Sequence, residues 1–252
     1  MRTRIVAMVG VITLVAVALS IRPLVFGGNS GAASVAAVTS ASATPSASSS
    51  ASSTSNSLTT RALSNTVSSE TVVVGLGDSI TFRPQSWFRQ TCSIGLIGDC
   101  LDAGIVGNTT LQMYARFQTD VVGAGADVMV LMGGTNDMRH GASTAQILKR
   151  LKRLVAAAHE NGIAVVLATV PARDGAKAGQ QVLALNRAIR RWAAAADLPL
   201  LDMYGAVGTK SGTYQAGLTD DGLHPNVAGF TRMAAIAEAK LPGLLQEALA
   251  AQ

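Results

Sequence analysis

From Thr71 onward, short and continuously apolar runs alternate with helical stretches, and this alternation is the strongest constraint on the fold. The runs lie at 71–76, 101–106, 127–132, 163–170 and 198–203. Runs that are apolar at nearly every position are typical of strands buried on both faces of a parallel sheet. Helical spacing separates and follows them, at 143–160, 177–196 and 226–250. The alternation predicts a three-layer α/β/α sandwich around a mainly parallel sheet of about five strands.

The first 28 residues carry the marks of an export signal. Met1–Arg4 is short and basic, and Ile5–Ile21 is an uncharged, mainly apolar run of 17 residues. The small residues Ala18 and Ser20 offer a cleavage site. An uncleaved anchor is the alternative, although 17 residues span only about 26 Å as a helix, at the short end for a bilayer. We expect 1–28 to be a signal peptide or N-terminal membrane anchor, and we favour cleavage.

Residues 29–69 predict a flexible tether. Of these 41 residues, 21 are Ser or Thr, and nine of the other 20 are Ala. This composition lacks the apolar side chains that offset the entropy of ordering a chain. We therefore expect a disordered linker, followed by one folded domain at 70–252. An exported domain on such a tether would be secreted or associated with the cell envelope.

The net charge of +5 does not indicate a nucleic-acid partner. Three arginines flank the apolar run near the N-terminus, and from Arg61 onward 17 basic residues face 15 acidic ones, which leaves only +2. The one basic cluster, within 149–153, falls in a helical pattern, where a solvated helix face is the favoured interpretation. Phosphate binding needs a stronger positive field than this.

Cys92 and Cys100 are the two cysteines of the chain. In an exported protein, two cysteines so close in sequence predict a disulfide. Two buried free thiols are the alternative. A metal site is not expected, because two cysteines without an adjacent histidine leave the ligand set incomplete.

Three of the predicted strands are followed by segments that can build a site. In an open parallel sheet, ligands bind beyond the carboxyl ends of the strands. Ser79 follows two glycines that allow a sharp turn, Gly107 precedes a Thr-rich helix start, and Asn136 follows a glycine pair. The segment around Ser79 fits neither a GxGxxG dinucleotide fingerprint nor a GxSxG nucleophile elbow. Taken singly, each segment is also consistent with a plain turn or a helix cap.

The segment 220–226 gives the most specific signal. His224 has a carboxylate three residues earlier, at Asp221, and a proline directly after it. Pro225 holds His224 extended and begins a helix. In such a turn the carboxylate can accept the imidazole Nδ1–H, which leaves Nε2 free to take a proton from a hydroxyl. The neighbouring Asp220 lacks the three-residue spacing.

Together and in this order, these segments resemble the SGNH (GDSL-type) hydrolase family. The resemblance covers roughly 71–245 and rests on four blocks, which are Gly77-Asp78-Ser79, Gly107, Gly134-Thr135-Asn136-Asp137 and Asp221-Gly222-Leu223-His224. One departure is Ile80, which stands where the family name has Leu. The resemblance implies the flavodoxin-like fold of these hydrolases.

The resemblance also implies a role for each site residue. Ser79 is then the nucleophile, His224 the general base and later the general acid, and Asp221 the residue that orients His224. The backbone N–H groups of Ser79 and Gly107 and the side-chain amide of Asn136 would form the oxyanion hole. This chemistry needs neither a cofactor nor a metal, and we expect none.

We therefore expect a serine esterase that hydrolyses carboxylic esters through an acyl-enzyme. Short acyl or acetyl groups are favoured, because the domain has no large insertion to form a lid. The ester would belong to an acylated glycan or lipid of the cell envelope, and an uncleaved N-terminus would tether the enzyme to the membrane. Two alternatives stay open: an O-acyltransferase that uses the same triad, and a non-catalytic module that binds envelope polymers. Four aromatic residues can border the cleft or belong to the core, namely Phe82, Trp87, Tyr114 and Phe117.

Overall fold

The computed structural model of the protein describes residues 67–252. The expected signal peptide or anchor at 1–28 lies outside these residues, and so does the expected linker at 29–69 except for its last three residues. Val67 is buried and donates its N–H to the Leu96 carbonyl at 3.3 Å. Within 67–252, no helix combines the length and the apolar character that crossing a bilayer requires.

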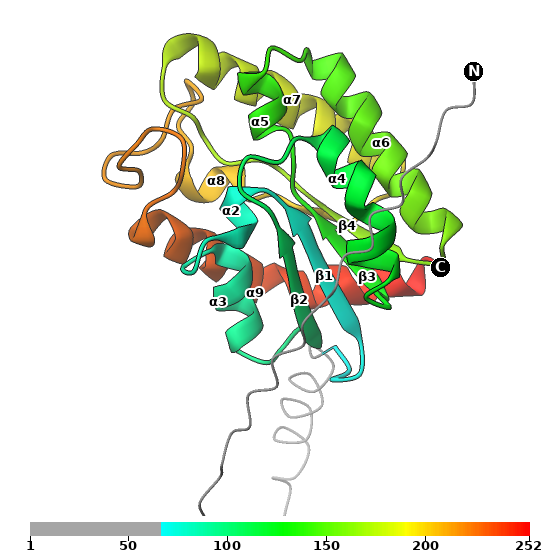
Figure 1. Ribbon diagram of the computed structural model, residues 1–252. Helices are drawn as coiled ribbons and strands as arrows, with labels where there is room; N and C mark the ends of the chain where they lie inside the picture. Colours follow the sequence, from blue (N-terminus) through cyan, green and yellow to red (C-terminus); the bar gives the residue numbers. More distant parts are fainter. Residues whose placement is uncertain (1–66) are drawn as a thin grey trace, which may run out of the picture. The chain divides into compact units, whose positions relative to one another are not determined.

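A parallel sheet of five strands lies at the centre of the described chain, as the apolar runs predict (Figure 1). Its strands are β1 (Val72–Gly77), β2 (Asp99–Gly104), β3 (Val128–Leu131), β4 (Ala164–Ala168) and β5 (Leu200–Leu201). Their order across the sheet is β2-β1-β3-β4-β5. β1 lies between β2 and β3, with Gly77 opposite Gly104 and Leu76 opposite Leu131. The carboxyl ends of these three strands therefore meet at one edge of the sheet.

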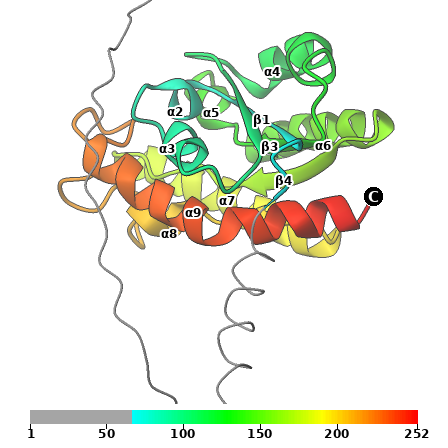
Figure 2. The ribbon, with the colours of Figure 1, turned by 90° about the horizontal axis from the view of Figure 1, so that it is seen from below.

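Helices cover both faces of the sheet, which gives the predicted three-layer sandwich (Figures 1 and 2). On one face, α3 (Trp87–Ser93) packs against α9 (Val227–Ala250). The layer on the other face consists of α4 (Thr110–Phe117), α6 (Thr144–Glu160) and α7 (Ala176–Ala195). Shorter helical segments are α2 (Ser79–Phe82), the π-helix η1 (Gln118–Val122), α5 (Thr135–Arg139) and α8 (Tyr204–Val207).

Side-chain caps fix where two of the long elements begin. Thr109 with Gln112 and Ser143 with Gln146 form capping boxes, in which each side chain satisfies a backbone N–H that the first helical turn leaves unpaired. The three helices predicted from sequence agree with the structure to within one residue at each end, as α6, α7 and α9.

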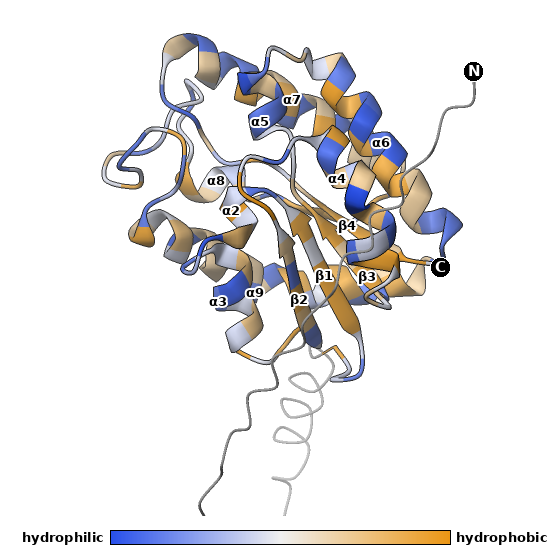
Figure 3. Cartoon of the chain, viewed as in Figure 1, coloured by the Kyte–Doolittle hydropathy of each residue, from blue (hydrophilic) through white to orange (hydrophobic). Residues whose placement is uncertain are grey.

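Burial separates the central strands from the edge strands. Every residue of β3 and β4 is buried, whereas β2 at one edge is partly exposed, and Figure 3 shows hydrophilic positions in it. The strand predicted at 198–203 is shorter than expected, because only Leu200 and Leu201 pair with β4. Pro199 has no N–H to donate. The N–H of Met203 donates to the Thr169 hydroxyl at 2.9 Å instead of extending the ladder.

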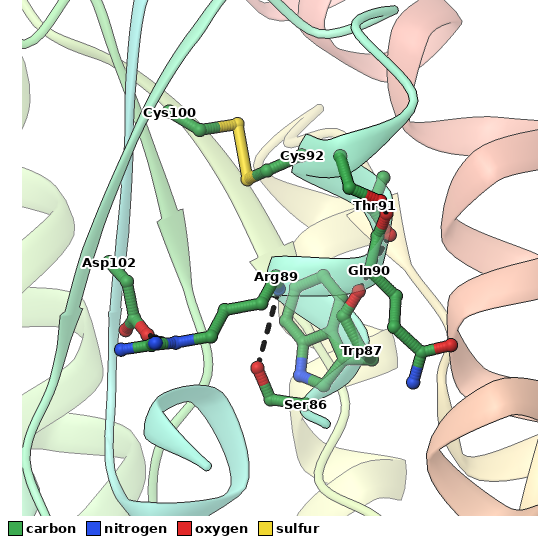
Figure 4. The surroundings of a disulfide bond; sticks show 9 residues. Ser86, Trp87, Arg89, Gln90, Thr91, Cys92, Cys100 and Asp102 are labelled. Carbon is green, nitrogen blue, oxygen red and sulfur yellow. Dashed lines mark hydrogen bonds and ion pairs between the residues drawn. A yellow bond between two sulfur atoms is a disulfide. The ribbon is translucent and has the colours of Figure 1, made fainter. Parts of the chain in front are cut away.

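A disulfide joins Cys92 of α3 to Cys100 of β2, as the spacing predicts, so neither thiol is free (Figure 4). The same two elements are joined a second time by an ion pair, in which Arg89 Nε lies 2.6 Å from Asp102 Oδ2. The covalent bond closes a short loop, and a crosslink of this kind stabilises the fold mainly by restricting the unfolded chain.

Replacing both cysteines, as Cys92→Ser with Cys100→Ser, should lower the free energy of unfolding by about 2.5 kcal/mol, the chain-entropy value for so short a loop. Urea denaturation of the two proteins measures this difference. Dithiothreitol should bring the wild type to the stability of the double variant and leave the variant unchanged. Equal midpoints for the oxidised wild type and the variant would show that the bond does not form.

Candidate active site

Ser79 is the first residue of α2, directly after β1. The preceding Asp78 caps this helix, since its Oδ1 accepts the N–H of Ile80 at 2.9 Å. The start of α2 lies against the end of β2, where Gly104 has no side chain. A Cβ there would come within 2.6 Å of the Phe82 nitrogen and 2.9 Å of the Asp78 carbonyl oxygen. The glycine therefore allows the close approach that places Ser79 at the sheet's edge.

The structure brings Ser79, His224 and Asp221 together. Ser79 Oγ lies 2.9 Å from His224 Nε2, across 145 residues of chain, and His224 Nδ1 lies 2.7 Å from Asp221 Oδ2. The other carboxylate oxygen of Asp221 accepts the backbone N–H groups of Leu223 at 2.9 Å and His224 at 2.7 Å. Thr219 closes the turn by donating its hydroxyl to the His224 carbonyl at 2.7 Å.

The hydrogen bonds to Asp221 determine the tautomer of His224. Desolvation raises the pKa of the Asp221 carboxyl, but the His224 ring and the two backbone N–H groups together hold the pKa well below its ordinary value. An ionised Asp221 accepts a hydrogen bond and cannot donate one, so the proton between these residues belongs to Nδ1. The lone pair of Nε2 then faces the hydroxyl of Ser79, which is the arrangement a general base requires.

Two backbone N–H groups predicted to bind an oxyanion have no acceptor in the described part of the chain, those of Ser79 and Gly107. Ser79 is at the first position of a helix, where the N–H has no intrahelical partner. Gly107 lies in the loop after β2 with φ of +78°, a conformation that favours glycine over any residue with a side chain. Both groups are therefore able to donate to a bound ligand.

The side-chain amide of Asn136 is bonded to protein acceptors. The side chain is buried at the start of α5, and its Nδ2 donates to Asp78 Oδ2 at 3.2 Å and to the Asn108 carbonyl at 3.1 Å. Both amide hydrogens thus have protein acceptors. The two distances are at the long end of the range for such bonds. Asn136 lies beside the site, and it must exchange one of these bonds before it can donate to a ligand.

Asp78 and Asp137 are buried carboxyls, and each has its own hydrogen-bond partners. Burial raises the pKa of Asp78 to about 7; the N–H of Ile80 opposes this rise and the nearby charge of Asp137 adds to it. Asp137 accepts the N–H and the hydroxyl of Thr110 at 2.8 and 2.6 Å, and pairs with Arg150 at 2.8 Å. Asp137 therefore ties α4 and α6 to α5.

Sequence reasoning missed Arg116, which supports two of the site segments from α4. Its guanidinium donates to the Gly77 carbonyl at 2.9 Å, to Asn108 Oδ1 at 2.8 Å and to Asp120 at 2.7 Å. The first two contacts hold the strand end before Ser79 and the loop after Gly107. Nothing in the sequence around Arg116 signals this role, because its contact with the Gly77 carbonyl joins positions 39 residues apart.

The four aromatic residues that follow the first two blocks are mostly parts of the core. Trp87 and Phe117 are buried, and Tyr114 packs under the guanidinium of Arg153, 3.8 Å from the ring centroid. Phe82 is the one of the four that is exposed, at 41%. It stands at the end of α2, three residues after Ser79, so it is the one of the four that can border a bound substrate.

More than half of the chain matches the model of a known protein family. Residues 76–232 match the model of the GDSL-like Lipase/Acylhydrolase family. Comparison with curated protein sequences gives no match.

Several solved structures share the fold. A putative lipolytic protein of the G-D-S-L family from Desulfitobacterium hafniense is 22% identical, with a TM-score of 0.61 over 67% of this chain and 98% of that one. A GDSL-like lipase from Bacteroides thetaiotaomicron is 24% identical, with a TM-score of 0.61 over 75% and 96%. An acetyl xylan esterase is 24% identical, with a TM-score of 0.58 over 67% and 98%.

The raised pKa of Asp78 predicts a pH-dependent stability. Because this pKa is about 7 in the folded state against 3.8 ordinarily, the folded state binds the proton more tightly. The contribution of Asp78 to stability is then full below about pH 4 and is lost as the pH rises to about 7. Asp78→Asn removes this pH-dependent contribution. The free energy of unfolding of the variant minus that of the wild type should therefore increase by on the order of 4 kcal/mol as the pH rises from 4 to 7.

Urea denaturation of both proteins at several pH values between 4 and 7 measures this slope. The substitution also alters the hydrogen bond to Asn136, but this changes the stability difference equally at every pH and leaves the slope unchanged. Asp99→Asn, at an exposed carboxyl on β2, is the matched control and should show no such slope. A stability difference between Asp78→Asn and the wild type that stays flat across these pH values would contradict the assignment.

Proposed function

We propose a catalytic role for Ser79, because the chain belongs to the GDSL-like lipase/acylhydrolase family and is an ester-hydrolysing enzyme. The single observation that carries the proposal is the line from Ser79 Oγ to His224 Nε2, at 2.9 Å, and from His224 Nδ1 to Asp221, at 2.7 Å. A serine hydroxyl is a weak nucleophile until an adjacent base removes its proton, and this line supplies such a base.

In the proposed reaction, His224 Nε2 accepts the proton of Ser79 as Oγ bonds to the ester carbonyl carbon. The carbonyl oxygen then carries negative charge, which the N–H groups of Ser79 and Gly107 and the amide of Asn136 stabilise. His224 returns the proton to the leaving alcohol, and an acyl-enzyme remains on Ser79. Water, activated by His224, attacks the acyl carbon and releases the acid. Asp221 holds the ring in place and stabilises the imidazolium.

We propose carboxylic esters with short acyl or acetyl groups as substrates. In support, one residue separates β1 from α2 and three residues separate β3 from α5, so neither of these connections is long enough to form a lid. The apolar side chains exposed at this edge are few and come from α2, α4 and the loop after β2, namely Phe82, Ile105, Val106 and Leu111. One structural neighbour with 24% identity is an acetyl xylan esterase.

We propose that the enzyme works outside the cell or at its envelope, on an acylated glycan or lipid. The support comes from the sequence of 1–28, which has the pattern of an export signal or anchor, and from the Ser/Thr-rich composition of 29–69. The disulfide between Cys92 and Cys100 is in keeping with an oxidising compartment. If the N-terminal segment is not cleaved, it would tether the domain to the membrane.

Ser79→Ala should abolish hydrolysis of p-nitrophenyl acetate and leave the fold intact, because the variant lacks the nucleophile but loses no core contact. The measurement is steady-state turnover, together with covalent labelling by a fluorophosphonate probe mapped by mass spectrometry. Ser93→Ala, at an exposed serine of α3, is the matched control and should retain both activities. Near-wild-type turnover by Ser79→Ala would refute the assignment. Transfer of the acetyl group to an added sugar instead of water would identify an acyltransferase.

Asn136→Ala should reduce kcat by about 100- to 1000-fold and change KM much less, which is the usual effect of removing one oxyanion donor. The kinetic constants are measured with the same ester, and thermal denaturation checks that the buried contacts to Asp78 and Asn108 are not the cause. An increase in KM with unchanged kcat would instead make Asn136 a ground-state binding residue.

A further inference from the structure

Three arginine side chains lie around the candidate active site, and none of them pairs with a carboxylate among residues 67–252. Arg83 follows α2, and its Nη2 lies 3.1 Å from His224 Nδ1. Arg139 ends α5 and contacts Asn136 Oδ1 at 3.3 Å. Arg173 follows β4, in a loop whose next residue donates its N–H to the Gly222 carbonyl at 2.8 Å.

The contact between Arg83 and His224 is not a hydrogen bond in the tautomer that Asp221 imposes. Nδ1 uses its proton toward Asp221, at 2.7 Å, and has no lone pair to offer. A guanidinium has only donors. Two donors, Arg83 Nη2 and His224 Nδ1, therefore lie 3.1 Å apart. The exposed guanidinium of Arg83 has no acceptor in this contact.

The charge of Arg83 lies where positive charge develops in the proposed reaction. His224 becomes positively charged when it takes the proton of Ser79, and like charges repel, so an anion bound at Arg83 would stabilise this step. Asp221 is the carboxylate that contacts the ring, and both of its oxygens are already engaged by His224 and Leu223. The other two arginines lie close enough to repel each other, since the charge of Arg139 adds to burial in lowering the pKa of Arg173.

We propose that the ester substrate carries an anionic group, a carboxylate or a phosphate, on its alcohol part, and that Arg83 binds this group. The alcohol side is assigned because His224 Nε2 returns the proton to the leaving alcohol, which must then lie next to the imidazole, and Arg83 lies against the same ring. A guanidinium matches both anions through paired hydrogen bonds. This inference rests on the proposed catalytic roles of Ser79 and His224.

The test compares matched ester pairs that differ in charge on the alcohol part. One pair is 3-acetoxybenzoate and its methyl ester, and the other is acetylglycerol 3-phosphate and monoacetylglycerol. For the wild type we expect kcat/KM to be higher for the charged member of at least one pair. Arg83→Gln should reduce the charged-to-neutral ratio by about tenfold, the loss of one charge-assisted hydrogen bond, and Arg83→Lys should reduce it less.

Arg191→Gln, at an exposed arginine of α7, is the matched control and should leave the ratio unchanged. The preference for the charged ester should weaken as the salt concentration rises from 0.05 to 0.5 M, because salt screens an exposed ion pair. The Debye length falls from about 14 Å to about 4 Å over this range. The pair that shows the preference distinguishes a carboxylate from a phosphate. A ratio that Arg83→Gln does not change, in both pairs, overturns the inference.

A second measurement separates this inference from the proposed reaction. Binding of 3-acetoxybenzoate and of acetylglycerol 3-phosphate to the Ser79→Ala protein, by calorimetry, should weaken about tenfold when Arg83→Gln is added. If the wild type hydrolyses the neutral esters through Ser79 and Arg83→Gln has no effect on either measurement, only the anionic site is wrong. If fluorophosphonate does not label Ser79 and no ester is cleaved, the proposed reaction fails, and the inference fails with it.

Discussion

The parallel pairing of β1 with both β2 and β3 is the constraint on which the site depends. It sets Gly77 opposite Gly104 and Leu76 opposite Leu131, so that three chain segments leave the sheet at the same edge. Ser79, Gly107 and Asn136 come from these three segments. The fourth segment, with Asp221 and His224, precedes α9, which packs on the face of the sheet that also carries α3. The distance between Ser79 and His224 is therefore a property of the whole sandwich.

A continuous set of polar contacts beneath the site links these segments to one another. Arg116 donates to the Gly77 carbonyl and to Asn108, the Asn108 carbonyl accepts from Asn136, and Asn136 donates to Asp78. Asp78 in turn begins α2, next to Ser79. Since buried polar groups without partners are costly, each of these residues restrains its neighbours in the set. The backbone N–H groups of Ser79 and Gly107 thus project from segments whose relative positions are fixed.

What the sequence could predict follows from how local each signal is. Apolar runs and helical spacing act within one element, and they predicted the five strands and the helices α6, α7 and α9. The spacing of Asp221 and His224 lies within one turn, so their contact was also predictable. Arg116 contacts Gly77 and Arg83 contacts His224 across long stretches of chain, and only the folded sheet brings these pairs together. The shortening of β5 likewise depends on the Thr169 hydroxyl, which belongs to the neighbouring segment.

Two side chains of opposite charge lie beside the His224 ring. The Asp221 carboxylate accepts the Nδ1 proton and is half exposed, so water screens part of its charge. The Arg83 guanidinium lies 3.1 Å from the same ring nitrogen. Under the proposed role of Arg83, a neutral ester leaves this positive charge in place, whereas an anionic alcohol group neutralises the guanidinium as the ester binds. The benefit then appears when His224 takes the proton, so selection for the anionic substrate would act on the transition state as well as on binding.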